Sequence, residues 1–159
     1  MAENIINELG ALAIGARMRR MIDLFSKDVE RIYAENGLEF ETKYFALFYL
    51  LSRRGGCGIM EIAKELGLTH PAIIDLARGL EKKGYIESVK SPDDLRKRIL
   101  RISKKGKATL PAFESVWSKI NRLNKQLMEG QQHNLLKALE ELETTLEEKS
   151  YYKRYYKQK

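Results

Sequence analysis

The side chains with the clearest chemistry in this sequence are cations gathered in one stretch. Between Arg78 and Lys107 there are eleven Lys and Arg residues against four Asp and Glu residues. This excess of seven equals the net charge of +7 for the whole 159-residue chain, so the charges of the other residues cancel. A basic stretch of this density predicts contact with a polyanion. The alternative is a lysine-rich surface that faces only water.

Sets of catalytic or metal-binding residues cannot be assembled from the sequence. His70 and His133 lie far apart, and neither has a Cys or carboxylate at the spacing of a metal site. Cys57 is the only cysteine and lies in a glycine-rich turn that allows exposure, but a structural or incidental thiol is favoured over a reactive one. The glycines around it are not a phosphate loop, because no strand precedes them and no Gly-Lys-Ser/Thr follows. We therefore expect no enzyme, no cofactor and no metal.

The composition narrows the class of protein further. Hydrophobic residues make up 43% of the chain and charged residues 32%, enough for one core beneath a heavily charged surface. A single cysteine excludes an internal disulfide and thus a stapled secreted scaffold. The N-terminal residues lack a basic leader, and no apolar run approaches the roughly 18 residues of a membrane span. We expect a soluble, cytoplasmic protein with no membrane partner.

Hydrophobic periodicity predicts two helices in the first third of the chain. The first is one long helix that ends at Asn36-Gly37, where glycine favours a helix stop. Its apolar residues recur at spacings of three and four and form one stripe: Ile14, Met18, Met21, Phe25, Val29 and Ile32. The second begins near Thr42 and is apolar almost all round, so we expect it to be buried on several sides.

The next segment has the pattern of a helix-turn-helix with a hairpin behind it. A short helix starts at Ile59 and ends at Gly67, and Thr69 can cap a second helix that runs to Gly84. Two helices joined by a short glycine-containing turn form a helix-turn-helix. Residues 85–90 and 97–103 then read as two strands, with turn-forming residues at 91–94 between them.

The remaining residues return to a helical period. One helix runs from Lys107 to a break at Gly130, and a last helix carries a heptad-like leucine seam. The seam consists of Leu135, Leu139, Leu142 and Leu146, with a companion face predicted from Leu110, Phe113 and Trp117. Such apolar surface predicts an obligate dimer. The Tyr- and Lys-rich tail at 151–157 either extends the last helix, which we favour, or forms a frayed basic end.

In this order the elements make a mostly α winged helix-turn-helix with a two-stranded β wing, flanked by long N- and C-terminal helices. The sequence resembles the multiple-antibiotic-resistance regulator (MarR) family over nearly its whole length. Residues 61–68 and 80–86 look like the helix-turn-helix frame of that family. Asp94-Leu95-Arg96 and the closing Ile-Ser-Lys-Lys-Gly at 102–106 look like its wing.

The resemblance implies a sequence-specific transcriptional regulator that binds double-stranded DNA as a homodimer. Residues 1–159 would form a single MarR-like chain, with 42–106 as the DNA-binding lobe and 1–36 and 107–159 as dimerisation helices. It also implies control by a small-molecule effector or by oxidation. The alternative is a winged-helix interaction or dimerisation module, since Pro71, Ala72 and Asp75 offer fewer phosphate donors than many relatives have.

Two groups of site residues follow from the resemblance. The expected DNA contacts are His70, Ala72, Asp75, Arg78, Lys82, Asp94, Arg96, Lys97 and Arg98. Arg96 suits a minor groove at the wing tip, or is an ordinary exposed arginine. Asp75 either accepts from a cytosine amino group or acts as a cap or a repelling charge. The residues expected to border an effector pocket, or else to be core, are Met21, Phe25, Tyr44, Phe48 and Trp117.

Overall fold

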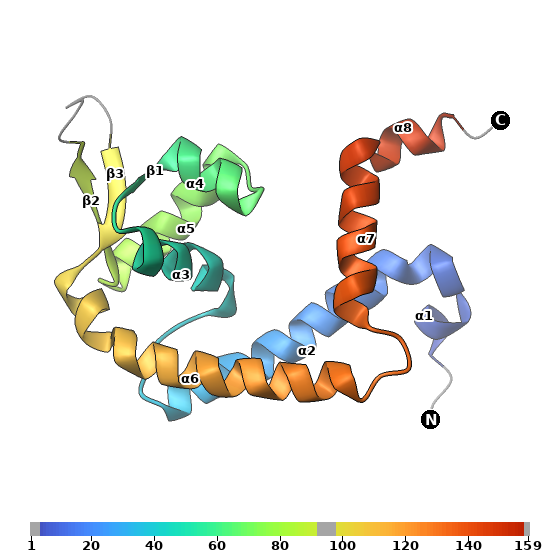
Figure 1. Ribbon diagram of the computed structural model, residues 1–159, viewed down its shortest axis with the longest axis horizontal. Coiled ribbons are helices and arrows are strands. Elements are labelled where there is room, and N and C mark those ends of the chain that lie inside the picture. The colour runs from blue at the N-terminus through green and yellow to red at the C-terminus, as the bar shows by residue number, and fades with distance from the viewer. Residues whose placement is uncertain (1–3, 92–97, 158–159) are drawn as a thin grey trace. The chain divides into compact units, whose positions relative to one another are not determined.

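The computed structural model describes residues 4–91 and 98–157 (Figure 1). The chain divides into two compact units, Met1–Val116 and Trp117–Lys159. The order of elements in the first unit is α1 (Ile5–Glu8), η1 (Gly10–Ala13), α2 (Ile14–Glu35), η2 (Thr42–Tyr44), α3 (Phe45–Arg54), β1 (Cys57–Gly58), α4 (Ile59–Leu66), α5 (His70–Lys82), β2 (Ile86–Lys90), β3 (Arg98–Ile102) and the start of α6 (Lys104–Glu129). The second unit holds the rest of α6, then α7 (Leu135–Glu148) and α8 (Tyr151–Tyr155).

The helix-turn-helix is formed by α4 and α5, as the sequence predicts. α4 ends at Gly67, whose φ of +63° is a left-handed conformation that glycine adopts without strain. The Thr69 hydroxyl caps α5 by accepting a hydrogen bond from the Ala72 amide at 3.4 Å. Pro71 lies in the first turn, where no intrahelical amide donor is required. Local capping chemistry therefore sets both ends of the turn.

The wing contains one strand more than the sequence predicts. β2 and β3 form the expected antiparallel hairpin, from Ile86 opposite Ile102 to Lys90 opposite Arg98. β1 pairs with the other edge of β3, so the sheet order is β1-β3-β2 (Figure 1). The prediction of a flexible, exposable turn at 55–58 is therefore wrong for Cys57, which lies in β1 and is buried.

The centre of the first unit is a cluster of aromatic rings around Phe40, which comes from the loop between α2 and η2. Five rings have centroids 4.7–5.9 Å from that of Phe40. They belong to Tyr33, Tyr44, Phe48, Tyr85 and Phe113. Edge-to-face packing of this kind adds to the free energy gained by burial. The cluster fastens α2, α3, α6 and the start of β2 to one another.

Both terminal regions differ in detail from the expected long helices. α1 and η1 precede α2, and Gly10, the first residue of η1, has a φ of +53°. α2 then ends at Glu35, before Asn36 and Gly37, as predicted. α6 begins at Lys104 rather than Lys107, because the Ser103 hydroxyl accepts a hydrogen bond from the Gly106 amide at 2.9 Å and so caps the first turn.

The tail is helical but is not a continuation of α7. The chain is extended at Lys149, and the Ser150 hydroxyl caps a new short helix, α8. The rings of Tyr152 and Tyr156, four residues apart, pack with centroids at 4.8 Å. None of the helices that the structure describes has the length and apolar character needed to cross a membrane.

Candidate DNA interface

The outward face of α5 carries the polar side chains that the sequence singles out. Ile73, Ala77 and Leu80 are buried, which turns the opposite side of the helix to solvent. The exposed residues of that side include His70, Pro71, Asp75, Arg78 and Lys82, whereas Ala72 is half-buried. An exposed helix with this composition can enter a major groove and present its side chains to base edges and phosphates.

Asp75 and Arg78 form an ion pair along this exposed face. The Arg78 Nη1 lies 3.4 Å from the Asp75 Oδ1, one helical turn away, and more than 70% of each side chain is exposed. Pairs this exposed contribute little to stability, because water screens them and both side chains lose freedom. Arg78 can therefore leave Asp75 for a phosphate at low cost.

The described part of the wing ends in cations. Lys90 and Arg98 pair across the outer end of the hairpin, and both are exposed. Asp94, Arg96 and Lys97 lie outside the described residues. Nearer the base, Arg101 Nε donates to Glu87 Oε1 at 2.7 Å across the two strands. The Arg101 charge is thus partly compensated before any partner binds.

The base of the wing is locked to the end of α5 by hydrogen bonds from the Ile-Ser-Lys-Lys-Gly segment. The Ser103 hydroxyl donates to the carbonyl of Gly84 at 2.6 Å, and the Ser103 amide donates to the carbonyl of Tyr85 at 3.0 Å. Lys105 Nζ donates to the carbonyl of Lys83 at 2.6 Å and lies 4.8 Å from the centre of the Tyr85 ring. These contacts fix the hairpin relative to α5.

Gly106 completes this joint by leaving room for the backbone. A Cβ added at Gly106 would collide with the carbonyl oxygen of Tyr85 and would lie 2.8 Å from Ile102 Cγ2. In the sequence, Gly106 is recognisable only as the end of a family motif, and nothing there indicates a role for Ser103 or Lys105. The spacing of those residues was visible, but their partners at 83–85 come from another part of the chain.

Gly79 makes a similar close approach on the buried side of α5. A Cβ added there would lie 2.7 Å from Cζ of Tyr44, so only glycine lets that ring rest against the helix. Tyr44 was predicted to border an effector pocket, and the structure places it in direct contact with α5. No local pattern in the sequence pointed to this pairing.

The residues predicted to border an effector pocket differ in how far they are buried. Tyr44 and Phe48 are buried in the aromatic cluster around Phe40. Met21 and Phe25 lie on α2 and are 45% and 42% exposed. Trp117 is buried and belongs to the second unit. The structure therefore brings Tyr44 and Phe48 together and leaves Met21 and Phe25 at the surface.

The remaining titratable candidates lack the features of a reactive site. Burial raises the pKa of the Cys57 thiol, and Glu61 adds to the effect. The thiol therefore stays protonated at neutral pH, which makes it a poor nucleophile. Within residues 4–91 and 98–157, no three His, Cys, Asp or Glu side chains gather closely enough to hold a metal ion.

Comparison with known proteins identifies the arrangement. Residues 41–97, from the residue before η2 to the residue before β3, match the sequence model of the MarR family. The HTH-type transcriptional regulator BilQ of Clostridioides difficile (strain CD3) is 28% identical over 109 residues, which cover 66% of this chain and 73% of BilQ. The structure is also similar to that of the transcriptional repressor CouR bound to a 23-mer DNA duplex, with a TM-score of 0.63 and 26% identity over 87% of this chain and 96% of CouR. Over residues 41–97 this chain is a MarR-family winged-helix transcriptional regulator.

A second solved structure has a similar fold. The structure of overoxidized AbfR bound to DNA has a TM-score of 0.66 and 18% identity, with 87% of this chain and 93% of that chain covered. At that identity the likeness establishes the fold alone. Because the MarR family comprises regulators of transcription, the assignment also places this chain among DNA-binding proteins rather than enzymes.

Proposed function

We propose that this MarR-family regulator binds a two-fold symmetric DNA site as a homodimer, with α5 in the major groove and the wing at the adjacent minor groove. The observation that carries the proposal is the exposed polar face of α5 beside a hairpin whose outer end is cationic. The similar CouR structure is bound to a DNA duplex, which supports DNA binding by this chain. Residues 42–106 would form the DNA-binding lobe, and the regulator would act in the cytoplasm.

The proposed contacts divide into two kinds. Polar and charged side chains would bind phosphates or base edges: His70, Arg78, Lys82, Lys97 and Arg98. Ala72 has no donor and would make only an apolar contact, and Arg96 would enter the minor groove beside Asp94. Selection of bound fragments from the source genome, followed by titration at several salt concentrations, tests the proposal. Specific binding that weakens steeply as salt rises is expected, because each neutralised phosphate releases counterions. A chain that selects no fragment would be an interaction module instead.

The helices at the two ends of the chain would form the dimer. Large apolar side chains stay exposed along both, and a monomer would present them to water. In the first unit they are Ile5, Leu9, Leu12, Ile14, Met18, Met21, Ile22, Leu24 and Phe25, and in the second they include Leu135, Leu136 and Leu142. The companion face predicted for the leucine seam is wrong for Phe113 and Trp117, which are both buried within a single chain.

We expect a solution mass of about twice the 18.4 kDa of one chain at low micromolar concentration. Leu12→Lys should shift the mass toward one chain, because Leu12 is 83% exposed in a single chain and loses apolar contacts only if a partner covers it. Met60→Lys is the matched control, since Met60 on α4 is 70% exposed and lies outside the terminal helices. Sedimentation that gives one chain for the parent would contradict the dimer.

Asp75 should discriminate among base pairs rather than anchor the protein. Asp75→Ala removes a negative charge near phosphates and releases Arg78, so non-specific affinity should stay the same or rise. Preference at one base pair should relax by about 1–3 kcal/mol, the value of a lost base-edge contact. Arg78→Ala should instead weaken binding to every sequence. The measurement is a panel of duplexes with each pair of the half-site changed in turn, and an unchanged preference profile for Asp75→Ala would show that the carboxylate does not contact bases.

A small-molecule effector would complete the proposed function. Tyr44 rests against Gly79 on α5. A ligand that moves the Tyr44 ring would therefore act directly on the recognition helix. Phe48 lies in the same aromatic cluster, and Met21 and Phe25 of the same unit complete the set proposed to border the pocket.

A further inference from the structure

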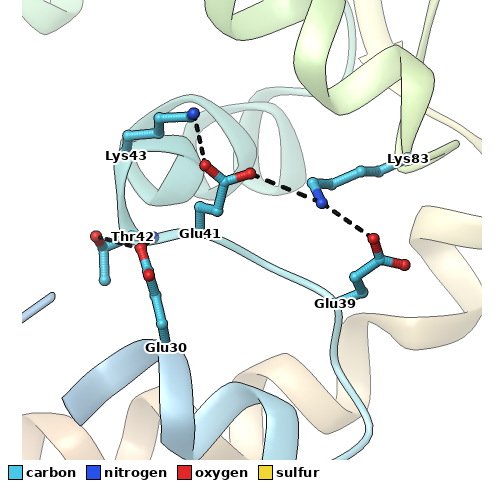
Figure 2. A network of polar contacts seen from close by, with 6 residues as sticks. All are labelled: Glu30, Glu39, Glu41, Thr42, Lys43 and Lys83. Carbon is cyan, nitrogen blue, oxygen red and sulfur yellow. Dashed lines mark hydrogen bonds and ion pairs between the residues drawn. The ribbon is translucent and has the colours of Figure 1, made fainter. Parts of the chain in front are cut away.

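The loop between α2 and η2 holds a group of charges that the DNA interface does not use. Its backbone is extended at Glu41, with φ of −105° and ψ of 145°, so neighbouring side chains point in opposite directions. Phe40 is buried in the aromatic cluster. Glu39 and Glu41, on either side of it, both lie against Lys83 instead (Figure 2).

Lys83 is the C-cap residue that follows α5. Its ammonium group is held by carboxylates of this loop. Lys83 Nζ lies 3.3 Å from Glu39 Oε1 and 3.7 Å from Glu41 Oε1. Only 19% of its side chain is exposed, whereas the preceding Lys82 belongs to the exposed residues. Burial opposes the charged form, but the hydrogen bond to Glu39 and the charges of both carboxylates outweigh it and raise the pKa of Lys83.

The same loop is tied to α2 at its other end. Glu30 Oε1 accepts hydrogen bonds from the Thr42 amide at 3.1 Å and the Thr42 hydroxyl at 3.2 Å (Figure 2). Lys43 Nζ lies 2.5 Å from Glu41 Oε2, and this hydrogen bond does most to lower the pKa of Glu41. Glu41 is thus ionised at neutral pH. The contacts run without interruption from α2, through the loop, to the end of α5.

The angle between α5 and α2 matters for a symmetric dimer bound to DNA. Two recognition helices that enter successive major grooves must lie roughly 34–36 Å apart, one turn of the DNA helix. A small rotation of each lobe about the loop would change this separation. The extent to which the loop allows this rotation therefore decides how strictly the protein selects the distance between half-sites.

We propose that Glu39, Glu41 and Lys83 are positioning residues that hold α5 at one angle to α2 and thereby set the half-site spacing this regulator prefers. The inference rests on the proposed function, since it requires a DNA-binding dimer. It assigns Lys83 to the loop and not to DNA, although the residue lies in the most basic stretch of the chain.

Lys83→Met tests the proposal against a matched neighbour. The duplexes carry two half-sites at the preferred spacing and at spacings one and two base pairs shorter or longer. Lys83→Met should lose about two- to fivefold of the discrimination between spacings, the range expected for one partly exposed ion pair, with an unchanged salt slope. Lys82→Met removes the same charge one residue earlier, and should lower the salt slope by about one phosphate and keep the spacing preference.

Three more variants separate positioning from damage to the fold. Lys83→Arg retains the charge and should restore the spacing preference. The double variant Glu39→Gln, Glu41→Gln should relax the spacing preference as much as Lys83→Met does. Adding Lys83→Met to that double variant should relax the preference no further, because all three residues act through one interaction. Hydrogen exchange without DNA should quicken at the 38–44 amides in Lys83→Met and not in Lys82→Met.

The outcomes distinguish this inference from the proposed function. If the parent and Lys83→Met bind duplexes with the same clear spacing preference, the positioning role is overturned and the proposed function stands. A Lys83→Met protein with a reduced salt slope would instead make Lys83 a phosphate contact, which also overturns it. A parent that binds no duplex would overturn the proposed function and the positioning role together.

Discussion

Phe40→Ala should lower the free energy of unfolding by about 3–5 kcal/mol, the usual cost of removing a buried phenyl ring. Phe40 is 5% exposed, and its ring contacts five others from α2, α3, α6 and the start of β2. The cavity would be bordered by rings on several sides, which cannot all collapse into it. Denaturant titration at fixed protein concentration measures the change, since dimerisation would make stability depend on concentration.

Phe45→Ala is the matched control for this change. It removes the same side chain from α3, but Phe45 is 41% exposed in a single chain, so less than half of the Phe40 effect is expected. Phe40→Leu should retain most of the stability, because it leaves a smaller cavity. Equal losses for Phe40→Ala and Phe45→Ala would show that the rings around Phe40 are not the centre of the core.

Gly106→Ala should destabilise the protein by about 1–3 kcal/mol, the cost of forcing an extra methyl group into a packed site. The added Cβ would meet the carbonyl of Tyr85, which already accepts a hydrogen bond from the Ser103 amide. A backbone carbonyl cannot rotate away as a long side chain can. Relief of the clash must therefore shift the base of the wing away from the end of α5, and DNA affinity should fall along with the melting temperature.

The same change at Gly15 should have the opposite sign. Gly15 lies inside α2, and a Cβ added there meets nothing within 4 Å. Alanine in such a helical position should raise the stability by about 0.5–1 kcal/mol, because it restricts the unfolded chain more than glycine does. Calorimetry on the two variants side by side gives the comparison, and a Gly106→Ala protein as stable as Gly15→Ala would contradict the close approach to Tyr85.

The elements that the sequence predicted correctly are those set by local chemistry. Thr69 begins α5 and Gly67 ends α4 through hydrogen bonds and backbone angles within a few residues. Helical spacing alone also predicts which side of α5 is buried, and it is correct for Ile73, Ala77 and Leu80. Leu76, which the same spacing places on that side, is only half-buried.

The features that escaped prediction depend on partners far away in the chain. Lys83 counts as one more cation in a basic stretch, and only the fold shows that Glu39 and Glu41 compensate it. Phe40 stands between two glutamates in a loop, a setting with no helical or strand period to mark a core residue. Helical spacing places Phe113 on one apolar side of its helix. The same spacing fits both an exposed seam that a partner covers and a face buried within one chain, so spacing alone could not predict its burial.

The third strand of the sheet has a consequence for the order of folding. β2 and β3 are joined by a short connection, so their hairpin can close at a small loss of chain entropy. β1 pairs with β3 only after α4 and α5 have brought Cys57 and Gly58 opposite Leu100 and Ile99. Contacts between such distant residues form late and open first. Transient opening of β1 would therefore uncover the Cys57 thiol while the hairpin stays intact, and the rate of thiol labelling would report this local unfolding.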